Sequence, residues 1–134
     1  MTRHLLVPMD DSEPARGALK YALSTFPDAE VTVVHAVDDL EAGYGGGPTT
    51  DAASDGEPPA LAVARSIADE YGRSIETAVV RGTPAAAILE SAADADVDGI
   101  VMGSQGRSGV SRMLLGSVAE AVARQSSIPV TIVP

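Results

Sequence analysis

The chain has 134 residues, 45% of them hydrophobic and only 3% aromatic, which predicts one domain with a core of Val, Ile, Leu and Ala. It contains no cysteine, which excludes disulfides and thiolate metal sites. Its net charge of −10 argues against a nucleic-acid partner, because phosphate backbones are bound by basic surfaces. No apolar stretch approaches the roughly 20 residues of a membrane span, so we expect a cytoplasmic protein without membrane contact.

The acidity itself has two interpretations. The chain carries 19 Asp and Glu against 9 Lys and Arg, and Lys20 is its single lysine. In molar salt the Debye length falls to about 3 Å, which screens repulsion among carboxylates, so the composition favours a salt-adapted organism such as a halophilic archaeon. The plainer alternative is an acidic soluble protein whose charge carries no information about its fold.

The first half of the chain alternates strand, helix and strand. Continuous apolar runs at Leu5–Pro8 and Val31–Val37 predict strands covered on both faces, as in a parallel sheet. Between them, apolar residues recur at i, i+3 and i+4 over Ala15–Phe26, which predicts a helix. Ser12 and Pro14 are typical of its first turn.

The connection that follows, Asp38–Pro58, is unusually long. It contains three successive glycines, a proline and several aspartates. Connections of this length are usually functional or disordered. Two interpretations stay open: a mobile Gly- and Asp-rich linker, or a loop that covers a ligand.

The second half repeats the alternation. In chain order it predicts a helix over Leu61–Tyr71, a strand over Ile75–Val80, a helix opened by Thr83 and Pro84, a strand over Gly99–Met102, a helix from Ser117 and a strand over Val130–Val133. Ser117–Glu120 reads Ser-Val-Ala-Glu, a capping box with Ser117 as the cap. The pattern predicts a single α/β domain over residues 1–134, with an open parallel five-stranded sheet and right-handed crossovers.

One segment lacks negative charge, since no carboxylate occurs from Gly99 through Ala119. It leads from a predicted strand to a predicted helix, and open α/β sheets bind ligands beyond the carboxyl ends of their strands. Free N–H groups at the helix start favour an anion, glycines admit a ligand close to the backbone, and Arg107 and Arg112 add charge-assisted donors. The segment suits phosphate; a flexible surface loop is the alternative.

The generic phosphate motifs are absent, since Walker A needs a lysine and the glycine spacing does not fit G-x-G-x-x-G. Instead Gly103-x2-Gly106-x9-Gly116-Ser117 resembles the ATP-binding signature of the universal stress protein family, G-2x-G-9x-G-[S/T]. The segments Val7–Glu13, Val34–Asp38, Leu114–Glu120 and Pro129–Val133 resemble the same family. The resemblance covers the chain except Asp38–Pro58 and points to the UspA-like, nucleotide-binding branch.

The resemblance implies a fold, a ligand and a site. The fold is a Rossmann-like, adenine nucleotide alpha hydrolase-like sheet of order 3-2-1-4-5 with helices on both faces. The ligand is ATP or another adenine nucleotide, with or without Mg²⁺. Asp10 would contact the ribose hydroxyls, with Asp11 or Ser12 capping the first helix; alternatively, Asp10 is itself a cap. The Ala36 backbone would meet adenine between apolar walls from Pro8 and Met102. The phosphate cradle would comprise Gly103, Gly106, Arg107, Gly116, Ser117 and Val118.

Efficient catalysis is not expected. His4 and His35 have no partners at metal-ligand spacing, so no metal site is predicted, and we expect His35 to be a packed residue with one satisfied nitrogen. The nucleophile-elbow spacing G-x-S-x-G is absent, and at most slow ATP hydrolysis is expected.

Three functions therefore remain. The first is an ATP-binding module that signals or protects under stress, and the second is a stress-family dimer that binds no nucleotide and acts through protein partners. The third is an enzyme of a related nucleotide-hydrolase architecture. Residues 128–133 would form an edge strand, and the resemblance implies a homodimer through it.

Overall fold

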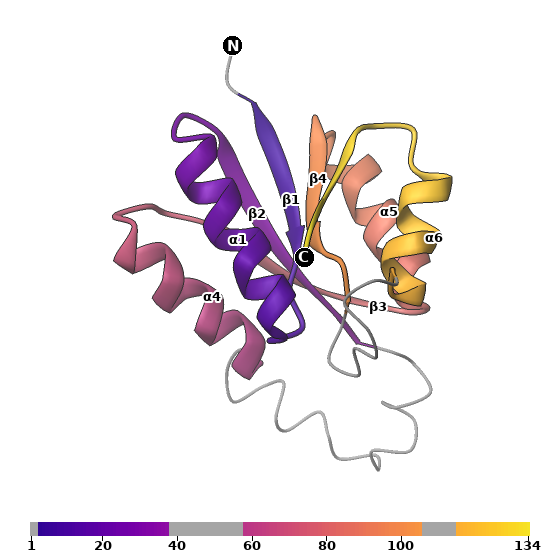
Figure 1. Ribbon diagram of the computed structural model, residues 1–134, viewed down its shortest axis with the longest axis horizontal. Helices are drawn as coiled ribbons and strands as arrows, with labels where there is room; N and C mark the ends of the chain where they lie inside the picture. Colours follow the sequence, from indigo (N-terminus) through magenta and orange to yellow (C-terminus); the bar gives the residue numbers. More distant parts are fainter. Residues whose placement is uncertain (1–2, 38–57, 106–114) are drawn as a thin grey trace.

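A computed structural model describes residues 3–37, 58–105 and 115–134. Within these residues the chain forms five strands and four helices (Figure 1). In chain order they are β1 (His4–Pro8), α1 (Glu13–Thr25), β2 (Glu30–Val37), α4 (Pro59–Glu70), β3 (Glu76–Arg81), α5 (Pro84–Ala95), β4 (Gly99–Gly103), α6 (Ser117–Gln125) and β5 (Val130–Val133). Each predicted strand is present, with its ends within one residue of the prediction.

The strands form one parallel sheet of order β3-β2-β1-β4-β5, which confirms the expected fold. The chain leaves β1 toward one edge through β2 and β3, and then crosses to β4 and β5 on the other side. β1 pairs with β2 along its whole length, whereas it pairs with β4 only at Leu5–Gly99 and Leu6–Ile100. The reversal between β1 and β4 is a topological switch point, where open α/β sheets bind ligands.

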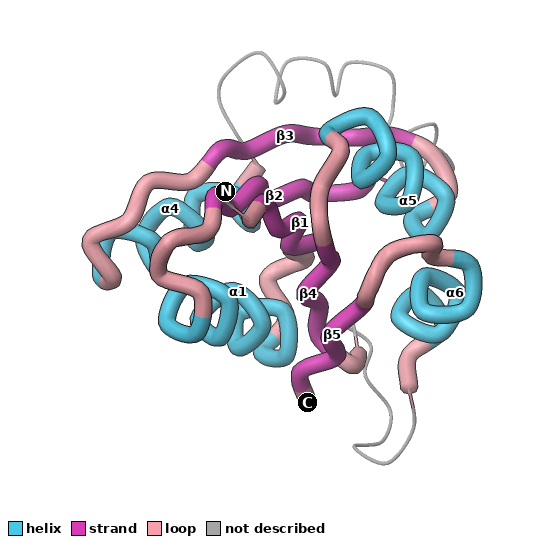
Figure 2. The backbone as a smooth tube through the Cα atoms, turned by 90° about the horizontal axis from the view of Figure 1, so that it is seen from above, coloured by secondary structure: helices cyan, strands magenta, loops and turns pink. Residues whose placement is uncertain are grey.

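Helices cover both faces of the sheet, as expected (Figure 2). Because side chains alternate along a strand, neighbouring residues of β1 enter different cores: Leu5 and Val7 pack under α1 and α4, whereas Leu6 packs under α5 and α6. Fully burying such a side chain contributes about 1.5–3 kcal/mol. The sheet is therefore covered on both faces, which is why its strands read as continuous apolar runs.

The helix starts agree with the predictions at two places and differ at one. Ser12 caps α1, its Oγ accepting from the Ala15 amide at 3.2 Å, and Pro84 opens α5 after Thr83. The capping box at Ser117 is wrong: Gly116 is the cap of α6, and Ser117 is already helical.

The error at α6 is one of register. A capping box needs the Glu three residues after the cap, but Glu120 lies four residues after Gly116. Its side chain instead accepts from Arg124 Nη2 at 3.2 Å, a pair that the i, i+4 spacing of a helix favours.

Some predictions lie outside the described residues. These include residues 38–57 of the long connection, and Gly106, Arg107 and Arg112 of the acid-free segment. Among the helices that the structure does describe, none combines the length and the apolar character needed to cross a membrane. The described residues also contain no group of three or more His, Asp or Glu side chains placed to hold a metal ion.

Candidate functional site

The candidate site lies at the carboxyl ends of β1 and β4. The first turns of α1 and α6 lie at this same end of the molecule, at the bottom in Figure 1. The start of α6 is tied to the end of β4, because the Gly116 amide donates to the Ser104 carbonyl at 2.7 Å. The Ser104 amide in turn donates to the Val133 carbonyl of β5 at 2.8 Å. The end of β4 is thereby bonded both to the start of α6 and to the end of β5, at the carboxyl end of the sheet.

Asp10 follows β1 and is held by Ser12. One carboxylate oxygen, Oδ1, accepts from the Ser12 hydroxyl at 2.6 Å and from the Ser12 amide at 3.0 Å. The other oxygen, Oδ2, makes no hydrogen bond to any residue that the structure describes. Asp10 does not cap α1, because Ser12 does, so the alternative role is wrong.

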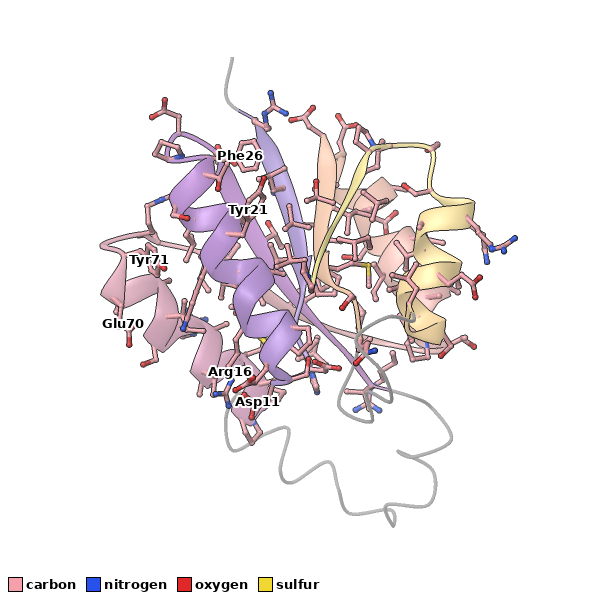
Figure 3. All side chains as sticks on the ribbon, in the orientation of Figure 1. Asp11, Arg16, Tyr21, Phe26, Glu70 and Tyr71 are labelled. Carbon is pink, nitrogen blue, oxygen red and sulfur yellow. The ribbon has the colours of Figure 1, made fainter. Side chains whose placement is uncertain are left out.

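Asp11 has a different role from its neighbour. Its backbone has φ = 67°, a left-handed conformation that aspartate tolerates better than most residues. Its Oδ1 accepts from Arg16 Nε at 2.9 Å and from Arg16 Nη2 at 2.7 Å, and Figure 3 shows the two side chains together at the start of α1. Of the two candidate caps, Asp11 and Ser12, the structure selects Ser12.

Gly103 ends β4 against the first turn of α1. A Cβ atom at this position would lie 2.6 Å from the Pro14 carbonyl carbon and 2.8 Å from the Ala15 nitrogen. No side chain fits without movement of the backbone, so glycine is required for close packing here. The glycine signature predicted this residue as part of a phosphate cradle, and no local pattern indicated its packing role.

The N-terminus of α6 presents unpaired amides. The Gly116 cap supplies no side-chain hydrogen bond, and the Glu120 amide makes the first bond of the helix, to the Gly116 carbonyl at 2.9 Å. The amides of Ser117 and Val118 therefore have no acceptor within the helix. The Ser117 side chain is exposed and does not cap the helix, so nothing on it competes for these amides. Such a helix start attracts anions.

The three predicted apolar contacts share one face of the sheet. Pro8 pairs in register with Val34 of β2, and Ala36 lies two residues further along that strand. By strand alternation they face the α5–α6 layer, in which Met102 is 5% exposed and packs with Leu6 and Val34. Met102 thus serves mainly as core, while Pro8 and Ala36 are partly exposed.

His35 connects β2 to the residue before Asp10. Its Nδ1–H donates to the Met9 carbonyl at 2.9 Å, which confirms a packed histidine with one satisfied nitrogen. Met9 is buried, and its amide donates to the Val34 carbonyl at 2.8 Å. The amide and the carbonyl of Met9, the residue before Asp10, are therefore both hydrogen-bonded to residues of β2. The pattern of the sequence did not reveal this contact.

The structure thus brings Asp10, Gly103, Gly116, Ser117 and Val118 to one end of the sheet. Gly106 and Arg107 are not described. Sequence reasoning missed Ser12 as the partner of Asp10, although the Asp-x-Ser spacing is a local signal, because short polar side chains two residues apart often bond in turns.

Comparison with known proteins gives consistent results. The family model described as the universal stress protein family matches residues 1–134. Universal stress protein MJ0531 of Methanocaldococcus jannaschii is 33% identical to this chain, and the match covers 98% of this chain and 81% of the relative.

Two solved structures are similar along almost the whole chain. That of hypothetical protein MJ0577 is 30% identical, with a TM-score of 0.76, and the match covers 99% of this chain and 96% of the other. That of a universal stress protein in complex with cAMP is 27% identical, with a TM-score of 0.69, and covers 98% and 96% respectively.

Proposed function

Since the chain belongs to the universal stress protein family, we propose that it binds ATP or another adenine nucleotide where β1 and β4 end. The nucleotide would make the protein a signalling or protective module under stress. The observation that carries this proposal is an arrangement of two groups. Asp10, whose Oδ2 makes no hydrogen bond within the described part of the chain, and the start of α6, which has no side-chain cap, are both fixed next to Ser104–Gln105.

The two groups suit the two polar parts of a nucleotide. Asp10 Oδ2 is a carboxylate acceptor for a ribose hydroxyl. The amides of Ser117 and Val118 and the dipole of α6 suit phosphate oxygens. The lack of any carboxylate from Gly99 through Ala119 removes repulsion from this region. Mg²⁺ would accompany the phosphates as the nucleotide's own ion.

The apolar part of the ligand has a place on the same face. Adenine would lie against Pro8, with the Ala36 backbone at its edge and Met102 beneath. Gly103 would form the base of the site, and Gly106 and Arg107, which lie outside the described residues, would complete the proposed cradle. A micromolar dissociation constant corresponds to about 8 kcal/mol, which ring burial, one charged hydrogen bond and several amides together can supply. The similar structure with cAMP supports an adenine nucleotide as the ligand class.

Binding rather than turnover is proposed. The sole lysine, Lys20, lies on the outside of α1 and not in the acid-free segment. Among the residues that the structure describes, the side chain bonded to Asp10 is the Ser12 hydroxyl, which is not a general base, and it occupies Oδ1. Hydrolysis of ATP at this site would therefore be slow at most.

The setting of this function is also proposed: a homodimer in the cytoplasm of a salt-adapted organism, acting on a protein partner. β5 is the last strand of the sheet, and its four residues are all half-buried. An edge strand with free backbone groups pairs readily with a second copy. The second candidate function is a dimer that acts through protein partners without nucleotide, and the position of β5 at the edge of the sheet favours such a dimer. Sedimentation at high salt tests the dimer, and a monomer would remove that part of the proposal.

Calorimetry with ATP at high salt tests the nucleotide site. Gly116 has φ = −66°, a backbone conformation that residues with a side chain adopt without strain. Gly116→Glu would place a carboxylate at the phosphate position and should weaken binding more than about tenfold, since a repulsive contact of only 1.4 kcal/mol has that effect. Ala123→Glu is the matched control, because it adds the same charge on the exposed surface of the same helix and should bind as the wild type does. Wild type that binds no adenine nucleotide, or two variants that bind alike, would refute the site.

A further inference from the structure

The two oxygens of Asp10 are not equivalent. Oδ1 accepts two hydrogen bonds, from the Ser12 hydroxyl at 2.6 Å and from the Ser12 amide at 3.0 Å. A carboxylate oxygen has two lone pairs, so these two donors fill it. The shorter bond has the length of a charge-assisted O–H···O⁻ contact. Of the two carboxylate oxygens, only Oδ2 is therefore available to accept a hydrogen bond from a ligand.

Ser12 is itself held in place. It is only 8% exposed, and its Oγ accepts from the Ala15 amide at 3.2 Å as the cap of α1. The hydroxyl has one proton, and Asp10 Oδ1 is its near acceptor; the other acceptor within reach, the Gln105 carbonyl, is 3.4 Å away. The Ala15 amide at the helix cap therefore holds the hydroxyl that orients Asp10.

From this geometry we infer that Ser12 is a positioning residue that sets the sugar specificity of the site. Ser12 occupies Asp10 Oδ1, so the carboxylate presents Oδ2 alone. Two neighbouring ribose hydroxyls align with the two oxygens of a carboxylate but not equally well with a single oxygen, so Oδ2 binds one hydroxyl strongly and the other weakly. This inference rests on the proposed nucleotide function and extends it to a choice between hydroxyls. Ser12 acts through Asp10 and need not touch the nucleotide.

Two analogues measure this asymmetry in the wild-type protein. Dissociation constants for ATP, 2′-deoxy-ATP and 3′-deoxy-ATP are determined by calorimetry at high salt. One analogue should bind about tenfold or more weakly than ATP, because it lacks a hydrogen bond to a charged acceptor, whereas the other should stay within about twofold. Equal losses for both analogues, or none for either, would overturn the inference while ATP binding still upheld the proposed function. Failure to bind all three nucleotides would overturn the proposed function itself.

A pair of substitutions then tests whether Ser12 causes the asymmetry. Ser12→Gly removes the hydroxyl but keeps a residue type that caps helices adequately, and it should weaken ATP binding and bring the two analogues within about twofold of each other. Ser12→Thr keeps a hydroxyl and should keep the wild-type preference. Ser24→Ala is the matched control, because the exposed Ser24 hydroxyl bonds only within α1, to the Lys20 and Tyr21 carbonyls.

The variants are compared after circular dichroism has shown that each is folded. A folded Ser12→Gly protein with the wild-type ratio between the two analogues would overturn the inference. A loss of overall affinity with that ratio unchanged would do so too, since it would show that Ser12 supports the fold of the site without directing Asp10.

Discussion

Gly103 and Pro14 meet where β4 ends against the first turn of α1, so closely that a Cβ atom on Gly103 would lie 2.6 Å from the Pro14 carbonyl carbon. The contact joins the two segments that carry the candidate site, since Asp10 and Ser12 precede Pro14, and Ser104 and Gln105 follow Gly103. The close packing of this end of the sheet therefore depends on Gly103 having no side chain.

Gly103→Ala should therefore destabilise the protein. The added methyl must displace backbone atoms of α1, and overpacking of this kind typically costs about 1–3 kcal/mol. Chemical denaturation at constant high salt measures the free energy of unfolding. Gly99→Ala is the control on the same strand, because its Cβ would lie 3.5 Å from its nearest neighbours, an ordinary contact. If both variants unfold alike, Gly103 has no special packing role.

The same substitution should weaken ATP binding at Asp10 but not at Asp11. Asp10→Asn removes the charge next to the proposed ribose and should weaken ATP binding about tenfold, by loss of a charge-assisted hydrogen bond. Asp11→Asn keeps a residue that tolerates positive φ and loses only a half-exposed ion pair with Arg16, worth about 0–1 kcal/mol of stability. Its affinity for ATP should be unchanged. Titration calorimetry and thermal melting of both variants check this, and a binding defect confined to Asp11→Asn would reverse the assignment.

The sequence predicted the elements better than their contacts. The apolar runs of β1 and β5 and the Ser12 and Pro14 start of α1 are local patterns, and each appears in the structure. The order of the strands came from the family signature, since periodicity does not say which strands are neighbours.

Two features could not be predicted, for different physical reasons. The cap of α6 differs by one residue because Gly116 and Ser117 are both acceptable caps, and the bond from Gly116 to Ser104 is tertiary. The close approach of Gly103 to Pro14 also depends on tertiary packing. The pairing of Asp10 with Ser12 is local, and a search for polar residues at i, i+2 would have found it.

His35→Leu should destabilise the strand end that carries the site. The substitution leaves the Met9 carbonyl without the donor that reaches it at 2.9 Å, and an unpaired buried acceptor costs about 1–3 kcal/mol. His4→Leu is the control, because its partner, the Thr32 hydroxyl, is half-exposed and can turn to water. Equal free energies of unfolding for wild type and His35→Leu would show that the Met9 bond contributes nothing.

Stability should rise with salt. Net charge −10 on 134 residues implies mutual repulsion, and raising ionic strength from about 0.1 M to about 1 M shortens the Debye length from about 10 Å to about 3 Å. We expect the melting temperature in KCl to increase by several degrees over this range. An unchanged melting temperature after dilution into low salt would contradict the interpretation of the acidity as salt adaptation.

A nucleotide that bridges Asp10 and the start of α6 would be visible in a crystal structure of the protein grown with ATP. We expect a ribose hydroxyl within hydrogen-bond distance of Asp10 Oδ2, with Oδ1 still bonded to Ser12, and phosphate oxygens at the amides of Ser117 and Val118. An end of β1 and β4 that stays empty at saturating ATP, or that is filled by the protein's own side chains, would contradict it.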